Sequence, residues 1–315
     1  MRPAPAFVFL VHPLVPAQRV VLGLRQLSLS RARGRRPETF GRIGTVGLPA
    51  HALGEVLGLM MEPEAMLADP QAAVDLMERA ARSVPGIRAV GLGSLCALVG
   101  GRGEELARRL SVPVTTGALA TAWALHGHAR AALKALGRPR GPVAVVGSAG
   151  PVGELVARLL VRDGVEVRVD NRRGSRAARV CAGPDEAVEG CPLVIGAGTS
   201  GGVLDPAALA RGAWLIDVAS PGTLKGEPER GVRVLPGEAL PLPAGWHRGL
   251  WGRAFHRVAG YGPRHVYACL VEPLVLAASG RDRPYALGSR LREEDLVDFD
   301  RRARAMGFSA SGFIG

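Results

Sequence analysis

A glycine-rich turn near the middle of the chain is the motif with the clearest chemistry. The spacing G-x-x-G-x-x-G follows an apolar run at residues 143–146 and precedes a helix-type run at 154–162. Glycines allow a tight strand-to-helix turn and let a pyrophosphate approach backbone N–H groups at the positive end of the helix. We therefore expect a dinucleotide to bind at Gly147, Ser148, Ala149, Gly150, Pro151, Val152 and Gly153.

The residues that would contact the adenine ribose lie about 20 residues further along. A second strand-like run ends at Asp170, whose carboxylate would accept a hydrogen bond from a ribose 2′-hydroxyl and favour NAD. Arg172, Arg173 and Arg176 would instead bind a 2′-phosphate and favour NADP. Because three arginines stand against one carboxylate, we predict NADP (NADPH) as the cofactor, with Asn171, Arg172 and Arg173 among its contacts.

A cysteine in the last part of the chain offers a second kind of chemistry. Pro263 suits the first turn of a helix, on which His265 and Cys269 would share one face. Glu272 would follow three residues later. A nearby imidazolium or arginine lowers the pKa of a thiol from about 8.5 and makes it a nucleophile. Cys269 is thus the predicted nucleophile and His265 its assistant, the alternative being a small buried apolar residue.

The elements that position these residues follow from the pattern along the chain. Strand-like runs that end in glycine loops alternate with helical segments from residue 143 to residue 218. This alternation predicts the α/β class, with a doubly wound parallel sheet. We expect a substrate-binding α/β domain at 1–138, an NAD(P)-binding Rossmann domain at 139–250, and a C-terminal helical segment at 251–315 that completes the active site.

Three features of the first predicted domain are candidates for function. Residues 7–11 predict a buried strand that delivers His12 to a loop, where it is either functional or simply hydrogen-bonded. A later strand leads into a glycine and serine turn at 91–94, which we expect to face a ligand. Thr115 or Thr116 is predicted to cap a long Ala/Leu-rich helix that leads into the second domain.

Composition limits the class of protein. The 315 residues carry a net charge of +12, with 47% hydrophobic and 22% charged residues, as in globular chains. No apolar stretch reaches the roughly 18 residues of a membrane span. The four cysteines show neither C-x-x-C pairing nor metal-ligand spacing, which favours free thiols and a cytoplasmic location. Scattered arginines and only 4% aromatic residues argue against nucleic-acid binding.

Taken in order, these residues resemble the long-chain acyl-(acyl carrier protein) reductases, which form fatty aldehydes and are related to quinate/shikimate dehydrogenase-like Rossmann proteins. The matching positions are His12, Gly47-Leu48-Pro49, Gly91-Leu92-Gly93-Ser94, Thr115-Thr116-Gly117, 143–153, Asn171-Arg172, Leu215-Ile216-Asp217, Ala268-Cys269 and Gly307-Phe308. The resemblance implies that Cys269 takes the acyl group from a carrier-protein thioester and that NADPH reduces it to an aldehyde. Acyl carrier proteins are acidic, so a net charge of +12 would steer their encounter with this chain.

The chain departs from that family in two places. Asn and His usually follow the Thr-Thr-Gly segment in the family, whereas Ala118, Leu119 and Ala120 follow it here. The region at 18–44 is also shorter and richer in arginine. These differences point to an acyl pocket of different length or polarity.

The leading prediction is an NADP-dependent reductase that converts an acyl thioester to an aldehyde through a Cys269 acyl-enzyme. The acyl donor would be an acyl carrier protein or coenzyme A. One alternative is a quinate/shikimate-type NAD(P) dehydrogenase that reduces a small carbonyl compound without a covalent intermediate. Another is a non-enzymatic, nucleotide-binding regulatory protein.

Overall fold

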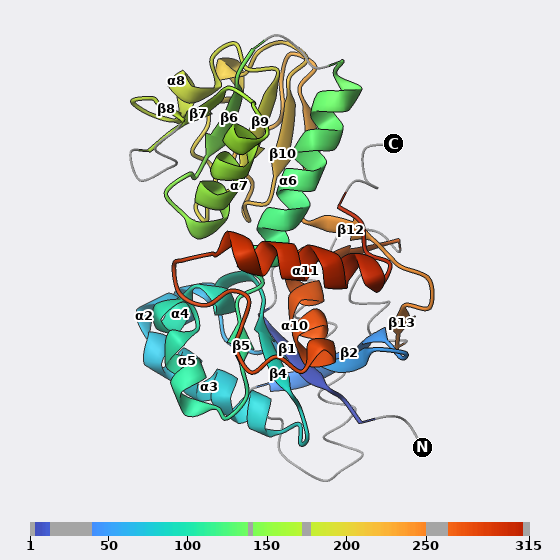
Figure 1. The fold of residues 1–315 in the computed structure, drawn as a ribbon. Coiled ribbons are helices and arrows are strands. Elements are labelled where there is room, and N and C mark those ends of the chain that lie inside the picture. Colours follow the sequence, from blue (N-terminus) through green and yellow to red (C-terminus); the bar gives the residue numbers. More distant parts are fainter. Residues whose placement is uncertain (1–3, 13–39, 138–140, 172–177, 250–263, 311–315) are drawn as a thin grey trace. The chain divides into compact units, whose positions relative to one another are not determined.

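A computed structural model describes residues 4–12, 40–137, 141–171, 178–249 and 264–310 (Figure 1). The chain divides into two compact units. The first unit contains residues 1–117, 241–290 and 297–308, and the second contains 118–240, 291–296 and 309–315. Each unit has its own sheet and is described by itself.

The sheet of the second unit consists of six parallel strands. They are β6 (Val143–Val146), β7 (Val167–Val169), β8 (Arg179–Val180), β9 (Leu193–Gly196), β10 (Trp214–Asp217) and β11 (Arg233–Pro236). Their spatial order is β11-β10-β9-β6-β7-β8. The chain therefore starts in the middle, builds outward to β8, and then returns to build the other half from β9. This is the 3-2-1-4-5-6 order of the dinucleotide-binding Rossmann fold, and it confirms the predicted fold class.

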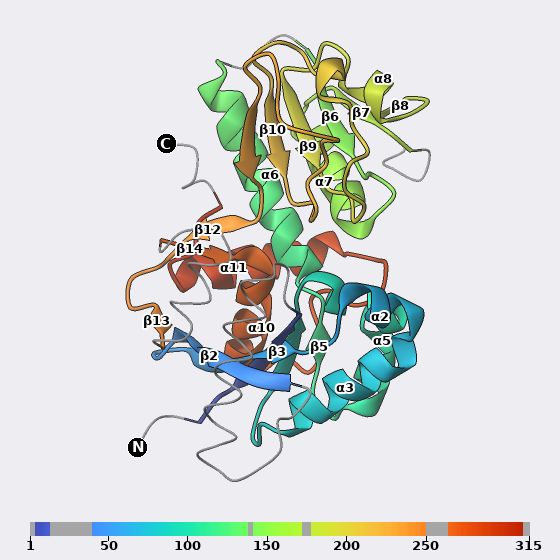
Figure 2. The ribbon, with the colours of Figure 1, turned by 180° about the vertical axis from the view of Figure 1, so that it is seen from behind.

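Helices cover both faces of this sheet. Helices α6 (Ala118–Ala135) and α7 (Pro151–Arg162) pack on each other and on one face, and Figures 1 and 2 show them from the front and from behind the sheet. The opposite face carries α8 (Pro184–Val188) and the short η2 (Pro206–Ala208). There Ala144 and Val146 of β6 pack in one buried cluster with Val188 of α8. Because both faces of the sheet are covered, the residues of β6 that point to either face can all be apolar.

The division of the chain differs from the predicted boundaries at 138/139 and 250/251. Helix α6 belongs to the second unit, because it packs on α7, β9 and β10. Residues 241–290 belong to the first unit and do not form a separate C-terminal segment with the residues after them. An Ala/Leu-rich helix is apolar enough to pack on either sheet, so its sequence does not reveal which one it joins.

The sheet of the first unit is mixed, in the order β13-β2-β3-β1-β4-β5. Its strands are β1 (Phe7–Val11), β2 (Phe40–Leu48), β3 (Ala52–Leu59), β4 (Ala89–Leu92), β5 (Val114–Thr115) and β13 (His247–Arg248). β1 lies parallel to both β3 and β4, and β4 lies parallel to β5. β2 and β13 continue the sheet in antiparallel fashion. The predicted strand at 7–11 is confirmed and lies at the centre of the sheet.

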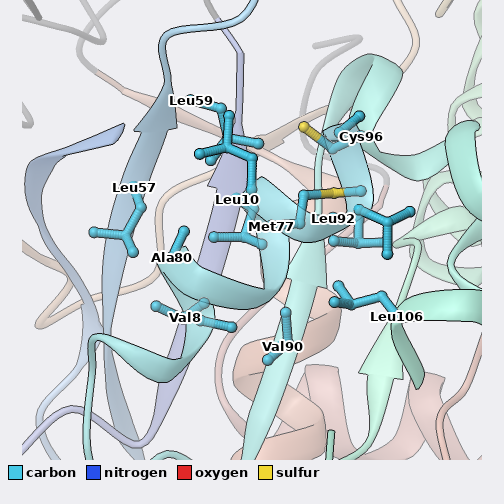
Figure 3. Packing of buried hydrophobic residues seen from close by; sticks show 14 of the residues in the cluster. Val8, Leu10, Leu57, Leu59, Met77, Ala80, Val90, Leu92, Cys96 and Leu106 are labelled. Atoms are coloured by element: carbon cyan, nitrogen blue, oxygen red, sulfur yellow. The ribbon is translucent and has the colours of Figure 1, made fainter. Parts of the chain in front are cut away.

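One face of this sheet packs on α3 (Pro70–Arg82), whose first turn is capped by the Asp69 side chain. Figure 3 shows Val8 and Leu10 of β1 against Met77 and Ala80 of that helix. The chain before and after α3 forms further short elements, which are the helices α2 (Pro63–Ala68), α4 (Val99–Arg102) and α5 (Glu104–Arg109) and the turn η1 (Ser94–Ala97).

The helix α10 (Ala268–Ser279) packs on β4, β1, β3 and β5 of the first unit. It follows β14 (His265–Tyr267), while β12 (Ala239–Pro241) and α11 (Glu293–Ala305) lie where the chain changes unit. Within the described parts of the chain, no helix has both the length and the apolar character that crossing a membrane requires.

Candidate functional site

The turn between β6 and α7 is built by glycine geometry. Gly147 has a φ of +85°, a left-handed conformation that strains other residues. A Cβ atom on Gly147 would lie 2.3 Å from the backbone nitrogen of Gly198, which follows β9. Gly147 therefore makes the tight turn and also lets the loops after β6 and β9 approach each other. These two strands are neighbours at the point where the strand order reverses, and ligands of such sheets bind there.

The other two glycines of the motif differ from the first. A Cβ on Gly153 would lie 2.5 Å from the carbonyl oxygen of Gly147, so Gly153 allows close packing of α7 against the turn. Gly150, the N-cap of α7, has a φ of −82°, and the nearest atom to its Cβ position is 3.5 Å away. Space is therefore open in front of Gly150. Turn, open approach and close packing are the three roles that glycines have in dinucleotide-binding loops.

The first turn of α7 offers donors to an anion. No side chain caps this helix, and Pro151 at its first position has no N–H. The N–H groups of Val152 and Gly153 belong to the first turn, which has no preceding carbonyl to bond within the helix. The residues present thus fit the pyrophosphate of a dinucleotide, and all seven residues predicted from Gly147 to Gly153 lie in this one turn.

Asp170, at the carboxyl end of β7, is bonded to the glycine turn. Its Oδ2 accepts a hydrogen bond from the N–H of Gly147 at 2.8 Å. Its Oδ1 accepts from the N–H of Ser148 at 3.0 Å and from the Ser148 hydroxyl at 2.6 Å. Asn171 is exposed beside it, whereas Arg172 and Arg173 lie outside the described residues. The sequence placed Asp170 at the ribose position but did not predict its bonds to the turn.

Asp217 at the end of β10 is a further residue that the sequence reading did not single out as part of the site. Its carboxylate accepts hydrogen bonds from the N–H groups of Ala219 and Thr223 and from the Thr223 hydroxyl, at 2.7 to 2.9 Å. A Cβ on Gly196 would lie 2.4 Å from this carboxylate. Asp217 therefore fixes the loop after β10 next to the loop after β9. An aspartate as the last residue of an apolar strand was the available signal.

The four cysteines differ in exposure. Cys96, Cys181 and Cys191 are buried, while Cys269 is partly exposed. Burial raises the pKa of the Cys96 thiol to about 12 and that of the Cys191 thiol to about 11. Burial, together with the nearby Glu186 carboxylate, also raises the pKa of the Cys181 thiol. These three thiols are poor nucleophiles, which leaves Cys269 as the candidate.

Cys269 is the second residue of α10, a helix that is largely buried. Every residue from 268 to 277 is buried except Cys269. The N-terminal end of a helix favours negative charge and therefore the thiolate form of a cysteine. Gly117, with a φ of +74°, lies against it, and a Cβ on Gly117 would be 2.5 Å from the Cβ of Cys269. The predicted nucleophile thus lies in a position suited to that role.

His265 does not share a helix with Cys269. The sequence predicted both on one helical face, but α10 begins only at Ala268 and His265 lies in strand β14. The backbone there is extended, and the N–H of Leu242 donates to the carbonyl of Arg264 at 2.9 Å. The four-residue spacing therefore has no helical meaning, and Pro263, which suggested the helix, lies outside the described residues.

Glu272 lies on α10 as predicted and is fully buried. Its carboxyl group is hydrogen-bonded to the hydroxyl of Thr115 in β5. The same hydroxyl accepts a hydrogen bond from the N–H of Ala286 at 3.3 Å. Thr115 or Thr116 was predicted to cap the helix α6, but that helix begins at Ala118 and the Thr115 hydroxyl bonds Glu272 of α10 instead. This contact was not predicted, because it joins residues 157 positions apart.

Two other predicted features have structural roles. His12 is buried, and its Nε2 accepts a hydrogen bond from the N–H of Leu95 at 3.2 Å. A Cβ on Gly91 would lie 2.4 Å from the Pro273 side chain. Gly91, the first residue of the turn predicted to face a ligand, therefore makes room for α10, and Ser94 at the end of that turn is exposed. Among the described residues, no group of three or more His, Cys, Asp or Glu side chains is arranged to hold a metal ion.

No protein-family model matches the chain. A curated relative, the aminotransferase PigE of Serratia sp., is 26% identical over 250 residues. That match covers 71% of this chain but only 28% of the relative, so the chain spans little more than a quarter of that protein.

Solved structures with a similar arrangement include three dehydrogenases. Quinate dehydrogenase from Corynebacterium glutamicum in complex with NAD has a TM-score of 0.40 and 14% identity, with 96% of this chain and 100% of that chain covered. Glutamate dehydrogenase from Thermus thermophilus has a TM-score of 0.42 and 16% identity, with coverage of 96% and 74%. L-tryptophan dehydrogenase from Nostoc punctiforme has a TM-score of 0.38 and 12% identity, with coverage of 96% and 89%. At these low scores, the fold assignment rests on the strand order of the second unit.

Proposed function

We propose that the chain is an oxidoreductase that uses a nicotinamide dinucleotide bound at the turn between β6 and α7. The observation that carries this proposal is the division of roles among Gly147, Gly150 and Gly153 where β6 leads into α7, in a sheet with the Rossmann strand order. When bound, the reduced cofactor supplies a hydride. The protein itself holds the pyrophosphate with the first-turn N–H groups of α7 and holds the turn with Asp170.

The simplest form of this activity requires no covalent chemistry from the protein. The substrate would then be a small carbonyl compound, as in quinate/shikimate-type dehydrogenases, and the product an alcohol. In this form Cys269 could be replaced by alanine with activity retained, because its sulfur forms no bond to the substrate.

A second candidate function is reduction of an acyl thioester to an aldehyde. It is favoured by the partial exposure of Cys269 in the first turn of α10, where the residues on either side of it are buried. The Cys269 thiolate would attack the thioester carbonyl carbon, expel the donor thiolate and hold the acyl group as a new thioester. Addition of a hydride to that carbonyl carbon, with loss of the Cys269 thiolate, would release the aldehyde. The acyl donor would be an acyl carrier protein or coenzyme A, both anionic, and the net charge of +12 favours such donors.

The match to an aminotransferase adds support for a carbonyl product. Aminotransferases consume aldehydes or ketones as amino acceptors, so a reductase that forms an aldehyde would supply their substrate. The matched region is 28% of PigE, which leaves most of that protein for other functions. In this second candidate the reductant would be NADPH, as the resemblance to acyl-(acyl carrier protein) reductases implies.

The test combines intact-protein mass spectrometry with cofactor titration. Wild type, Cys269→Ala and the control Cys181→Ala are incubated with long-chain acyl-coenzyme A or acyl carrier protein, without reductant. An acyl-sized mass gain in wild type and Cys181→Ala, absent from Cys269→Ala and discharged by NADH or NADPH, would establish the thioester reductase. Cofactor binding without any adduct, with carbonyl reduction retained in Cys269→Ala, would establish the non-covalent dehydrogenase. Failure to bind either reduced cofactor would refute the oxidoreductase proposal.

A further inference from the structure

We propose that Glu272 is a positioning residue for Cys269, which it holds in place for acyl transfer through its hydrogen bond to Thr115. The inference rests on the second candidate function, in which the Cys269 thiolate attacks an acyl thioester. Glu272 is a fully buried ionisable side chain to which that reaction assigns no role. Burial of a carboxyl group is unfavourable unless the group is hydrogen-bonded, so its presence on α10 requires an explanation.

The i→i−4 hydrogen bonds of α10 do not include the peptide groups of Cys269. Its N–H lies in the first turn, which has no preceding helical carbonyl to bond. Its carbonyl would normally accept from the N–H of residue 273, but that residue is Pro273, which has no N–H. Contacts from outside α10 must therefore fix the position of Cys269.

Two glycines let the strands of the same unit approach this turn closely. A Cβ on Gly117, just after β5, would lie 2.5 Å from the Cβ and 2.6 Å from the Cα of Cys269. A Cβ on Gly91 of β4 would lie 2.4 Å from the ring of Pro273. Both are van der Waals contacts, which set how closely α10 approaches the strands but not how the helix is turned about its axis.

The hydrogen bond between Glu272 and Thr115 sets that rotation. Cys269 and Glu272 are three residues apart, so they are neighbours on the surface of α10. A Glu272 side chain that points to β5 therefore also brings Cys269 to the end of that strand. Three residues rise about 4.5 Å along a helix and two residues about 6.6 Å along a strand, so the Glu272–Thr115 and Cys269–Gly117 contacts can form together.

Thr115 is itself held in place. It is fully buried, and its hydroxyl accepts a hydrogen bond from the N–H of Ala286 at 3.3 Å. The carbonyl of Ala286 lies 3.1 Å from the same hydroxyl, but it already accepts from the N–H of Thr116 at 3.0 Å. The single proton of the Thr115 hydroxyl is therefore available to Glu272. Glu272 thus bonds a side chain that both β5 and the segment at Ala286 hold.

The experiment measures acylation and alkylation of Cys269 in the full chain. Wild type is compared with Thr115→Val, which removes the hydroxyl, and with Thr115→Ser and Glu272→Gln, which keep groups able to form the bond. Thr45→Val is the matched control, because it removes a threonine–glutamate hydrogen bond of 3.1 Å, to Glu55, from the part of the same sheet beyond β1. Intact-protein mass spectrometry follows acylation over a range of palmitoyl-coenzyme A concentrations. Peptide mass mapping follows alkylation by iodoacetamide at neutral pH.

We expect Thr115→Val to lower the maximal acylation rate at least about tenfold and to leave the half-saturating donor concentration within about threefold of wild type, because misplacing a reacting group slows the reaction more than it weakens binding. Alkylation should slow at least about threefold, since the thiol loses its fixed place at the N-terminal end of α10, where the thiolate is favoured. Thr115→Ser and Glu272→Gln should keep both rates within about twofold of wild type, because the hydrogen bond remains. Thr45→Val should also leave both rates unchanged, even where urea unfolding shows a loss of stability.

The outcomes separate this inference from the proposed function. Wild-type acylation and alkylation in Thr115→Val would overturn the inference. So would a loss of both rates in Glu272→Gln alone, because the charge of Glu272 and not its hydrogen bond would then be responsible. No acyl adduct on wild type would refute the second candidate function. Slower alkylation of Thr115→Val would in that case still support the positioning of Cys269, and equal alkylation rates would overturn it.

Hydrogen exchange of wild type decides the matter if Thr115→Val does not fold. The N–H groups of Val271 and Glu272 are the first that bond carbonyls within α10. If the first turn is fixed on the sheet, they should exchange about as slowly as the N–H groups of β4. Exchange at the rate of an open chain would overturn the inference.

Discussion

Replacing each glycine of the turn by alanine should give three different outcomes. For Gly147→Ala, the left-handed backbone conformation costs about 1 to 2 kcal/mol. The new Cβ would also lie 2.3 Å from the nitrogen of Gly198 and 2.8 Å from the carbonyl carbon of Ala197, both backbone atoms that cannot rotate away. Such overpacking costs about 1 to 3 kcal/mol. We therefore expect Gly147→Ala to lower the free energy of unfolding by about 2 to 5 kcal/mol.

The other two substitutions separate packing from ligand access. In Gly153→Ala the helix gains about 1 kcal/mol from alanine, but the Cβ would lie 2.5 Å from the Gly147 carbonyl oxygen, so we expect a net loss of stability. In Gly150→Ala the backbone is extended and the nearest atom is 3.5 Å away. A small loss at the N-cap and a small gain from a stiffer unfolded chain should cancel to within about 0.5 kcal/mol. Gly150→Ala should therefore fold normally but obstruct the pyrophosphate.

Urea unfolding followed by circular dichroism measures the stability, and NADH and NADPH fluorescence titrations measure the binding. We expect Gly150→Ala to unfold at the wild-type urea concentration and to bind its cofactor at least tenfold more weakly, a change of about 1.4 kcal/mol or more. Gly147→Ala should unfold at a lower urea concentration than wild type and Gly150→Ala. Wild-type affinity in Gly150→Ala would refute the placement of the pyrophosphate at α7, and equal destabilisation of all three variants would refute the assignment of separate roles.

Three further outcomes can be measured. Iodoacetamide at neutral pH should label Cys269 before Cys96, Cys181 and Cys191, because those three thiols are buried. Peptide mass mapping of the labelled native protein measures the four rates, and equal rates would contradict this expectation. Gly117→Ala should lower the free energy of unfolding by about 2 to 5 kcal/mol, because its Cβ would lie 2.5 Å from that of Cys269. Gly280 is the control, since its φ is similarly positive but no atom lies within 4 Å of its Cβ position. Gly280→Ala should therefore cost only about 1 to 2 kcal/mol in the same urea assay. Burial raises the pKa of Asp298, but hydrogen bonds from Tyr285, Arg301, Arg302 and Arg281 outweigh it and hold that pKa below its ordinary value. The stabilisation by ionised Asp298 is therefore present above about pH 4 and is lost as the pH falls further. The difference in urea midpoint between wild type and Asp298→Asn should be largest at neutral pH and shrink in acid. A difference that stays constant with pH would contradict the stabilising role of the Asp298 carboxylate.

The sequence by itself determined the elements whose causes are local. A run of four apolar residues, a glycine triplet with fixed spacing and a following helix pattern sufficed to predict β6, the turn and α7, and the structure has strand 143–146 and helix Pro151–Arg162 there. The buried strand at 7–11 and the long helix that includes Ala118–Ala135 were predicted in the same way. These predictions depend on backbone preferences and on hydrophobic period, which neighbouring residues decide.

The tertiary structure alone decided how those elements combine. The sequence did not reveal that α6 packs on the second sheet, that His265 lies in a strand, or that the Thr115 hydroxyl reaches Glu272. It also gave two opposite indications of cofactor choice, a carboxylate and a group of arginines. Only the hydrogen bonds from the glycine turn to Asp170, across 22 and 23 residues, distinguish a fixed acceptor from a free side chain. Contacts of this kind depend on which strands become neighbours, and that order follows from packing of the whole sheet, not from any segment within it.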